Sequence, residues 1–273
     1  MHDLLIEPGR TEQNYWRDLW RYRELFYFLS WRDILVRYKQ TVIGIAWAVV
    51  RPLLTTLVFS FIFGRIAKLP SDGSAPYNVM VFVAMMPWQF FSTSLTDCSN
   101  SLIGNSNLIS KIYFPRLIVP AGSVITSFVD FLISAAILVV IMAWYHCWPD
   151  LRILSIPLFI ALAFAASAGP GLWLAALNVK YRDFRYIVPF VVQTGLYFSP
   201  VGFSSKIVPD KWRLLYSMNP MVGVIDGFRW AFLRGETPLY WPGLGMSAVV
   251  IVVLLVSGVW YFRHVEQTLA DVI

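Results

Sequence analysis

Two ionisable residues inside long apolar runs are the strongest chemical signal in this sequence. Arg51, followed by Pro52, interrupts the run 42–66, and Asp130 lies within the run 115–146. A charge near the middle of a membrane costs about 2.5–3.5 kcal/mol on insertion scales, so it usually faces protein or a water-filled path. The two residues lie roughly 14 Å and 20 Å along helices that begin on the same side. They could pair within one subunit or across a dimer, although a separate local partner for each is the simpler expectation.

The sequence lacks the common motifs of hydrolysis and metal binding. It has no Gly-Lys dipeptide, and therefore no phosphate-binding G-x-x-x-x-G-K-[ST] loop, and it has neither H-E-x-x-H nor G-x-S-x-G. Cys98 and Cys147 are isolated and form no Cys/His cluster. An intramembrane transferase would need a compact acid or base set, for which only Asp97, Asp183 and Asp226 are available. We therefore predict no catalytic residue, metal or cofactor in this chain, and energy supplied by another subunit.

The composition indicates an all-α integral membrane protein. Of 273 residues, 58% are hydrophobic and 14% are charged, with a mean hydropathy of +0.61. Soluble domains have about 45–50% apolar and about 25% charged residues. The net charge of +6 does not indicate nucleic acid, because the basic residues are scattered along the edges of the apolar runs. They are better explained as topology signals.

The chain divides into an N-terminal segment, 1–40, and a transmembrane domain, 41–273. Basic and apolar residues fall on opposite sides of a helical wheel over 13–40, which predicts an amphipathic helix in the cytoplasmic interface; a solvated helix packed on a soluble partner is the alternative. A membrane span needs about 20 residues. Six runs approach or exceed this length and predict six spans, at 42–66, 76–97, 115–146, 153–178, 186–204 and 242–262.

The distribution of basic residues predicts that both termini are cytoplasmic. Thirteen Lys and Arg residues fall on the predicted cytoplasmic side and eight on the outer side. The segment 205–241 is too polar to span and too apolar for a free loop, so we expect short re-entrant helices over 207–234. The second has Asn219 as its cap and Pro220 at its first position. Asp226 and Arg229, three residues apart, can pair on one face of it.

Four stretches, in this order and with six predicted spans around them, carry a family resemblance. They are "RDILVRYKQTVIGIAWAVVRPLL" (32–54), "NSNLISKIYFPRLIVP" (105–120), "LNVKYRDFRYIVPF" (177–190) and "NPMVGVIDGFRWAF" (219–232). With them the sequence resembles the membrane subunits of ATP-binding-cassette exporters for bacterial polysaccharides. That family includes the permeases for O-antigen, teichoic acid and capsule.

The resemblance implies a homodimer in the bacterial inner membrane, with two copies of a separate ATPase subunit that binds ATP and Mg²⁺. It also implies a cargo, a polysaccharide linked to undecaprenyl pyrophosphate. The same architecture could export another cargo, such as teichoic acid, capsule, a drug or a lipid. Two alternatives to an exporter subunit remain: a self-contained carrier or channel, and an intramembrane glycosyl or acyl transferase.

The resemblance also implies where the ATPase binds. The interfacial helix within 13–40 and a coupling helix at about 98–113 would contact it, although the second segment could be a plain connecting loop. An apolar helix of this kind could sit in a groove of the partner. The candidate coupling residues are Leu102, Ile103, Leu108, Ile109, Arg17 and Arg21.

A path for sugars would use aromatic rings, which offer broad apolar faces and, in Tyr and Trp, polar tips. Most membrane aromatics serve packing, so each candidate has that alternative. The candidate path residues are Trp47, Arg51, Phe59, Trp88, Phe90, Phe91, Tyr197 and Phe198. A cationic edge could attract either a pyrophosphate or phospholipid headgroups; its residues are Arg37, Lys39, Lys180, Arg182 and Arg185.

Overall fold

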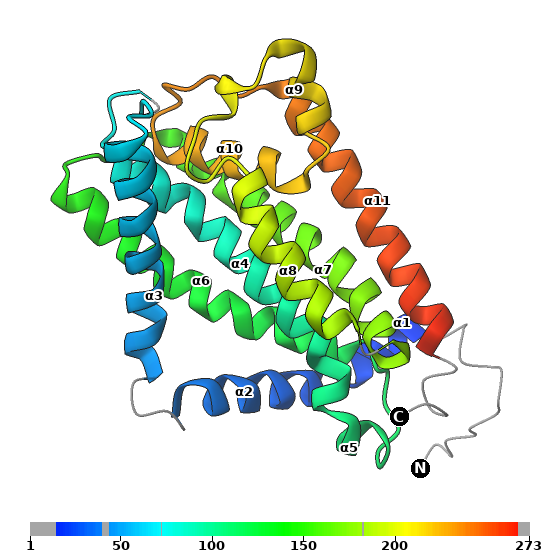
Figure 1. Cartoon of the computed structure of the whole chain (residues 1–273). Coiled ribbons are helices and arrows are strands. Elements are labelled where there is room, and N and C mark those ends of the chain that lie inside the picture. The colour runs from blue at the N-terminus through cyan, green and yellow to red at the C-terminus, as the bar shows by residue number, and fades with distance from the viewer. Residues whose placement is uncertain (1–14, 40–43, 72, 182, 267–273) are drawn as a thin grey trace.

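The computed structural model describes residues 15–39, 44–71, 73–181 and 183–266, and all regular structure in these ranges is helical (Figure 1). This confirms the all-α class. Five helical stretches are long and apolar enough to cross a membrane, which makes the protein a multi-pass membrane protein. They are Ala46–Ile66, Tyr77–Gly104, Ile118–Trp144, Leu151–Lys180 and Trp241–Glu266.

These five stretches match five of the six predicted spans. The first consists of α3 (Gly44–Phe59) and a π-helix (Ser60–Ile66) that continues it. The second, α4 (Tyr77–Gly104), extends seven residues beyond the predicted 76–97 and takes in the start of the predicted coupling segment. The others correspond to α6 (Ile118–Trp144), to α7 (Ile156–Lys180) with the short 3₁₀ helix Leu151–Ser155 before it, and to α11 (Trp241–Glu266).

The predicted fifth span, 186–204, corresponds to a shorter helix, α8 (Phe184–Phe198). Its 15 residues extend about 22 Å at 1.5 Å per residue. The hydrocarbon core of a bilayer is roughly 30 Å thick. Ser199 is extended, with φ −98° and ψ 149°, and Pro200 follows it. A proline disfavours helical geometry in the residue before it, so the helix ends at Phe198.

α4 is the central helix of the bundle. In the most apolar 18-residue stretch of α4, 78% of the residues are buried, compared with 22% in the corresponding stretches of the first span and of α11. Phe90 of α4 packs against Phe128 and Phe131 of α6 and against Phe164 of α7. Ring contacts of this kind add to the burial of large apolar surfaces. They hold α4, α6 and α7 together as the core on which the outer helices pack.

Two helices lie across the ends of the spans at one end of the bundle (Figure 1). The predicted helix over 13–40 is observed as α1 (Tyr15–Arg21) and α2 (Arg23–Lys39), separated at Tyr22. An apolar cluster joins them to the spans; its members include Tyr15, Leu29, Leu102, Ile109, Phe114, Ile118 and Phe262. The short helix α5 (Ser106–Ile109) lies at the same end.

The opposite end is closed by α9 (Asp210–Tyr216) and α10 (Pro220–Phe232), with the 3₁₀ helix Ser205–Ile207 before them. The predicted cap is confirmed: the Asn219 side-chain oxygen accepts a hydrogen bond from the Met221 N–H at 3.0 Å. α10 is almost fully buried and contacts α4, α7 and α11. The 205–241 segment therefore packs onto the bundle as ordered helices.

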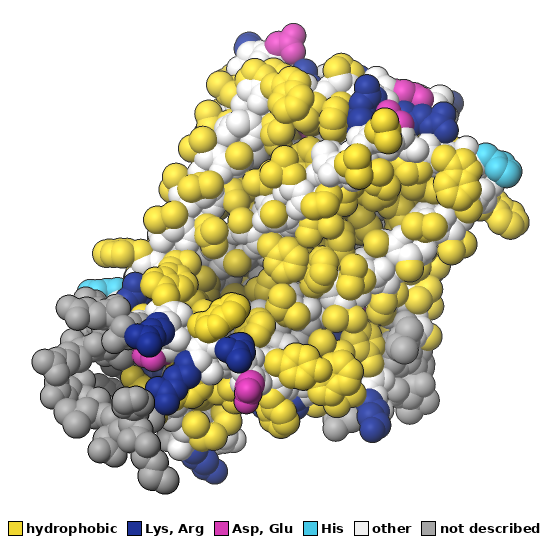
Figure 2. All heavy atoms as spheres, turned by 180° about the vertical axis from the view of Figure 1, so that it is seen from behind, with side chains coloured by type: hydrophobic (Ala, Val, Ile, Leu, Met, Phe, Trp, Pro, Cys, Tyr) yellow, Lys and Arg dark blue, Asp and Glu magenta, His cyan; other side chains and the backbone are white. Residues whose placement is uncertain are grey.

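Hydrophobic side chains cover the middle of the face opposite to that of Figure 1, while the charged side chains gather at its two ends (Figure 2). Over the spans as a whole, exposed apolar residues include Val140 on α6 and Val252 and Trp260 on α11. An apolar band between two charged rims is the surface that a bilayer requires. The composition-based assignment to the membrane thus has a direct counterpart in the arrangement of side chains.

Candidate functional site

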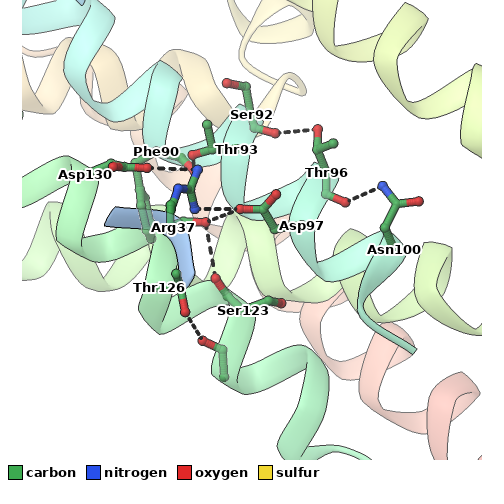
Figure 3. A network of polar contacts seen from close by, with 12 residues as sticks. Arg37, Phe90, Ser92, Thr93, Thr96, Asp97, Asn100, Ser123, Thr126 and Asp130 are labelled. Atoms are coloured by element: carbon green, nitrogen blue, oxygen red, sulfur yellow. Dashed lines mark hydrogen bonds and ion pairs between the residues drawn. The ribbon is translucent and has the colours of Figure 1, made fainter. Parts of the chain in front are cut away.

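One arginine of α2 bridges two carboxylates on different spans (Figure 3). Arg37 Nη1 lies 3.0 Å from Asp97 Oδ2 on α4, and Arg37 Nη2 lies 3.0 Å from Asp130 Oδ2 on α6. Tyr38 donates its hydroxyl hydrogen bond to the other oxygen of Asp130. We call these four residues the Arg37 cluster. It fastens α2, which lies across the spans, to two of them.

The two α2 residues of the Arg37 cluster, Arg37 and Tyr38, both stay protonated beside their acidic partners. Burial opposes the charged form of Arg37, but Asp97 and Asp130 outweigh that effect and raise the arginine's pKa. Burial, together with the hydrogen bond to Asp130, raises the pKa of Tyr38. Arg37 therefore stays a cation and Tyr38 a neutral donor at physiological pH. The cluster acts as a fixed connection between helices.

The two intramembrane charges identified in the sequence, Arg51 and Asp130, do not form an ion pair with each other. Asp130 is held by Arg37 and Tyr38, both from α2. Arg51 is exposed and lines a cavity that Asp130 also lines, but no described residue forms an ion pair with it. Asp130 thus has a local partner of its own, the simpler of the two expectations. The sequence placed Arg37 outside the spans, so it gave no signal for this pairing.

α4 carries a polar face that the sequence reading missed. The α4 polar stripe consists of Gln89, Ser92, Thr93, Thr96, Asp97 and Asn100, all at least partly exposed. Their spacing places them on one side of a helix, so the signal was available in the segment "QFFSTSLTDCSN". Ser92, Thr93, Thr96 and Asn100 each donate a hydrogen bond to a backbone carbonyl three or four residues earlier. Their polar groups are thereby satisfied within a membrane helix.

The α4 polar stripe lies between the contacts of α4 with α3 and α8. Both helices contact α4 and lie on either side of it (Figure 1). Trp88 faces Gly195 of α8 closely enough that an added methyl group there would lie 3.0 Å from its ring. Gln89 and Thr93 line the cavity beside α3. On a helical wheel Ser92 and Thr96 fall between these two directions, so the stripe faces the space between α3 and α8.

The candidate path aromatics divide into surface and interior residues. Trp47 is 61% exposed on α3, and Tyr197 and Phe198 are exposed at the end of α8. Phe59 is buried and stacks on Tyr197 with ring centroids 6.3 Å apart. The remaining three belong to α4: Trp88 and Phe90 are buried, and Phe91 is partly buried beside Trp88. A role of these rings in a substrate path stays a prediction.

The candidate coupling residues also divide by burial. Leu102 and Ile109 are buried in the apolar cluster beneath α1 and α2, while Ile103 and Leu108 are partly buried. Arg17 and Arg21 are exposed on α1. The exposed apolar tip of this region is formed instead by Ile112 and Tyr113, which are 51% and 59% exposed. The sequence reading did not single them out, because a loop following a helix has no periodicity that separates inside from outside.

Glu266 at the end of α11 joins the elements around this tip. Its carboxylate accepts from the Tyr15 hydroxyl at 2.9 Å and from the Arg116 N–H at 2.7 Å. The guanidinium of Arg116 donates to the Glu266 carbonyl at 2.6 Å. α1, the start of α6 and the end of α11 are thus tied to one residue.

At the opposite end, Arg229 of α10 is only 1% exposed. It donates to the carbonyls of Val201 at 2.9 Å and Phe203 at 2.8 Å, which holds the segment after α8 against α10. Its predicted pairing with Asp226 stays a prediction. Among the described ranges no group of three or more His, Cys, Asp or Glu side chains could hold a metal ion.

Comparison with known proteins gives matches over most of the chain. The family described as "ABC-2 type transporter" matches residues 24–233. The O-antigen export system permease protein RfbA of Klebsiella pneumoniae is 26% identical over 92% of this chain and 95% of its own length. The protein of the same name from Myxococcus xanthus is 26% identical over 87% and 91%. The polysialic acid transport protein KpsM of Escherichia coli is 22% identical over 87% and 92%.

Proposed function

The chain belongs to the ABC-2 type transporter family, and we propose that it exports a polysaccharide linked to undecaprenyl pyrophosphate from the cytoplasm. Membership makes it a transport subunit and implies a partner ATPase, in agreement with the resemblance seen in the sequence. The cargo rests on one observation, the match to O-antigen export permeases over nearly the full length of both chains.

The assembly that we propose is a homodimer with two ATPase subunits in the bacterial inner membrane, ATP and Mg²⁺ being bound by those subunits. α8 is the sixth crossing, completed by the turn that follows it, and α9 and α10 are re-entrant from the outer side. The excess of Lys and Arg at the α2 end supports a cytoplasmic location for both termini. The burial of α10 among spans supports its depth in the outer leaflet.

The α4 polar stripe and the exposed rings of α3 and α8 suit a sugar chain. Hydroxyl and carboxamide groups of Ser92, Thr96 and Asn100 can exchange hydrogen bonds with sugar hydroxyls and still keep their helical partners. Tyr197 and Phe198 near the outer end of α8 offer faces on which sugar rings can pack. Two subunits with α3 and α8 facing each other would enclose both stripes in one path.

Coupling would run through the cytoplasmic end of the subunit. The exposed Ile112 and Tyr113 tip, with Arg17 and Arg21 of α1, forms the surface for the ATPase. Movement of α2 would act on α4 and α6 together, because Arg37 holds Asp97 and Asp130 at once. ATP-driven approach of the two ATPase copies could thereby shift the spans that border the stripe.

The test is export in cells whose own copy of the gene is deleted. The chain should restore polysaccharide at the cell surface, and its loss should cause the undecaprenyl-linked polysaccharide to accumulate inside. Thr96→Leu removes one hydroxyl of the stripe and should reduce export several-fold. Ser257→Leu is the matched control, since Ser257 on α11 also donates to a carbonyl four residues earlier, at 2.6 Å. Normal surface polysaccharide in the deleted strain would refute the function.

A second candidate cargo is a capsular polymer. It is favoured by the relative named as a polysialic acid transport protein, which matches 87% of this chain. The same deletion strain distinguishes the two cargoes, because the polymer that accumulates inside identifies the substrate. Accumulation of a polysialic-acid-like polymer would favour the second cargo. A drug or a lipid as cargo would leave the surface polysaccharide unchanged.

A further inference from the structure

A cavity of about 240 Å³ lies beside the first half of α3, bordered by α2, α4 and α6. α3 contributes Trp47 and Arg51 to its lining, α4 contributes Gln89, and α2 and α6 contribute the Arg37–Asp130 pair. Pockets for drug-sized ligands enclose about 300–1,000 Å³. This cavity is smaller and suits a single headgroup-sized chemical group.

Arg51 gives the cavity an available positive charge. Among the residues that the structure describes, none forms an ion pair with it. The acid of the lining, Asp130, has one oxygen on Arg37 and the other on Tyr38. A guanidinium inside a span is costly without an anionic or polar partner. The geometry therefore calls for an anion that the described part of this subunit does not supply.

The other polar groups of the lining also favour an anion. The Gln89 carboxamide and the Trp47 indole can donate hydrogen bonds, and neither has a partner among the described residues. A guanidinium binds a phosphate through two parallel hydrogen bonds. Three donors around one small cavity match the several acceptor oxygens of a phosphate.

The depth of Arg51 points to a lipid as the source of that phosphate. Arg51 lies seven positions after Gly44, about 10 Å along α3, and a long arginine side chain can reach back toward the interface. Beyond it, Leu54, Leu57 and Val58 are exposed along α3 toward the membrane centre. A headgroup at Arg51 would leave its acyl chains along this apolar surface.

We infer that the cavity binds the phosphate of an anionic phospholipid, with Arg51 as its charge partner and Gln89 and Trp47 as hydrogen-bond donors. The lipid fills the space between α3 and the Arg37 cluster and so fixes α3 relative to α2. The site lies within one subunit and does not involve the α4–α8 contact. It borders the proposed cargo path, because Gln89 and Thr93 also belong to the α4 polar stripe, but the assignment to a phospholipid does not rest on the cargo proposed above.

The experiment measures lipid binding to the delipidated full chain by native mass spectrometry. The probes are phosphatidylglycerol, zwitterionic phosphatidylethanolamine and undecaprenyl pyrophosphate. Arg51→Gln should weaken phosphatidylglycerol binding about tenfold, the loss expected for a charged hydrogen bond. Ala48→Phe, which fills the cavity without changing charge, should weaken it similarly. Arg51→Lys keeps the charge and should retain most of the binding.

Arg65→Gln is the control, because Arg65 is exposed at the far end of the same helical rod. It should bind phosphatidylglycerol as the unchanged chain does. Equal binding by the unchanged chain and both cavity variants would overturn the site. An equal loss in Arg65→Gln would also overturn it, since general surface attraction would then explain binding. If only the binding of undecaprenyl pyrophosphate depended on Arg51, the cavity would belong to the cargo and the phospholipid proposal would be refuted.

Discussion

At the scale of single residues, the decisive contact is a guanidinium shared by two acids. Arg37 is about one-third exposed, and its partners Asp97 and Asp130 are 37% and 25% exposed. Partial exposure weakens ion pairs, but the two ion pairs here join three different helices. Ser127 adds a hydroxyl donor to Asp97 at 3.1 Å. The cluster is thus a local contact with consequences for the position of α2.

Replacing Arg37 should loosen α2. Arg37→Gln leaves two carboxylates without their cation, and we expect the free energy of unfolding to fall by about 2 kcal/mol. Arg37→Lys should recover only part of this, because an ammonium lacks the planar fork that reaches both acids. The measurement is unfolding of the purified chain in detergent. Arg21→Gln, on exposed α1, is the control and should change stability by less than about 0.5 kcal/mol. Equal effects at Arg37 and Arg21 would rule the cluster out as a tie.

At the scale of elements, α7 and α11 approach each other through glycine. A methyl group added at Gly258 of α11 would collide with the backbone of Gly169 on α7, and one added at Gly169 would lie 2.7 Å from the Leu254 backbone. Small residues let membrane helices pack closely where no hydrophobic effect drives them together. α7 continues as one helix through Pro170. Gly169 therefore does not break the helix, and its small size serves the close contact with α11.

Two glycines on α11 should respond oppositely to alanine. Gly258→Ala should destabilise the chain by about 1–3 kcal/mol, because the added methyl forces α7 and α11 apart. Gly245→Ala should be neutral or stabilise by up to about 1 kcal/mol, since alanine favours helix and nothing lies within 4 Å of its added methyl. Thermal unfolding of both variants in the same detergent makes the comparison. A Gly258→Ala variant as stable as Gly245→Ala would contradict the close contact.

In the coupling region, the residues that stabilise the fold differ from those expected to contact the ATPase. Leu102→Ala should cost about 2–5 kcal/mol of stability, because Leu102 is fully buried and its loss leaves a cavity. Tyr113→Ala should leave stability nearly unchanged, because the ring is mostly exposed. It should instead lower cargo-dependent ATP hydrolysis by the assembled transporter about tenfold, as loss of an interface anchor does. Full hydrolysis with Tyr113→Ala would remove the tip from the ATPase interface.

At the scale of the whole molecule, the number of crossings depends on α8. With six crossings, Cys147 and residue 206 lie outside and residue 110 lies inside. With five, residue 206 would be cytoplasmic and the C-terminus would be outside. Lys206 and Ser110 are both exposed, so each can carry a reporter thiol.

Thiol labelling should resolve the two topologies. A membrane-impermeant maleimide should label Cys147 in intact cells, and in a Cys147→Ser background it should label Lys206→Cys. Ser110→Cys should react only after permeabilisation; the native Cys98 is buried and should stay silent. Labelling of Lys206→Cys only after permeabilisation would contradict the sixth crossing and the cytoplasmic C-terminus.

The sequence by itself determined the features that depend on neighbouring residues. Five spans, the helices of the 13–40 segment and the Asn219 cap were readable, because hydrophobicity, amphipathicity and capping act over a few turns of chain. The polar face of α4 was readable in the same way, from residues at helical spacing, although it was overlooked.

Only the tertiary structure decided which distant residues meet. Asp130 pairs with Arg37, 93 positions away, and Leu102 is buried although its segment resembled a surface for a partner. The role of Gly258 likewise follows from the crossing of α11 with α7. Such contacts depend on the crossing angles of the helices and on how deeply each residue is packed in the bundle. The residue pattern along the chain does not specify either quantity.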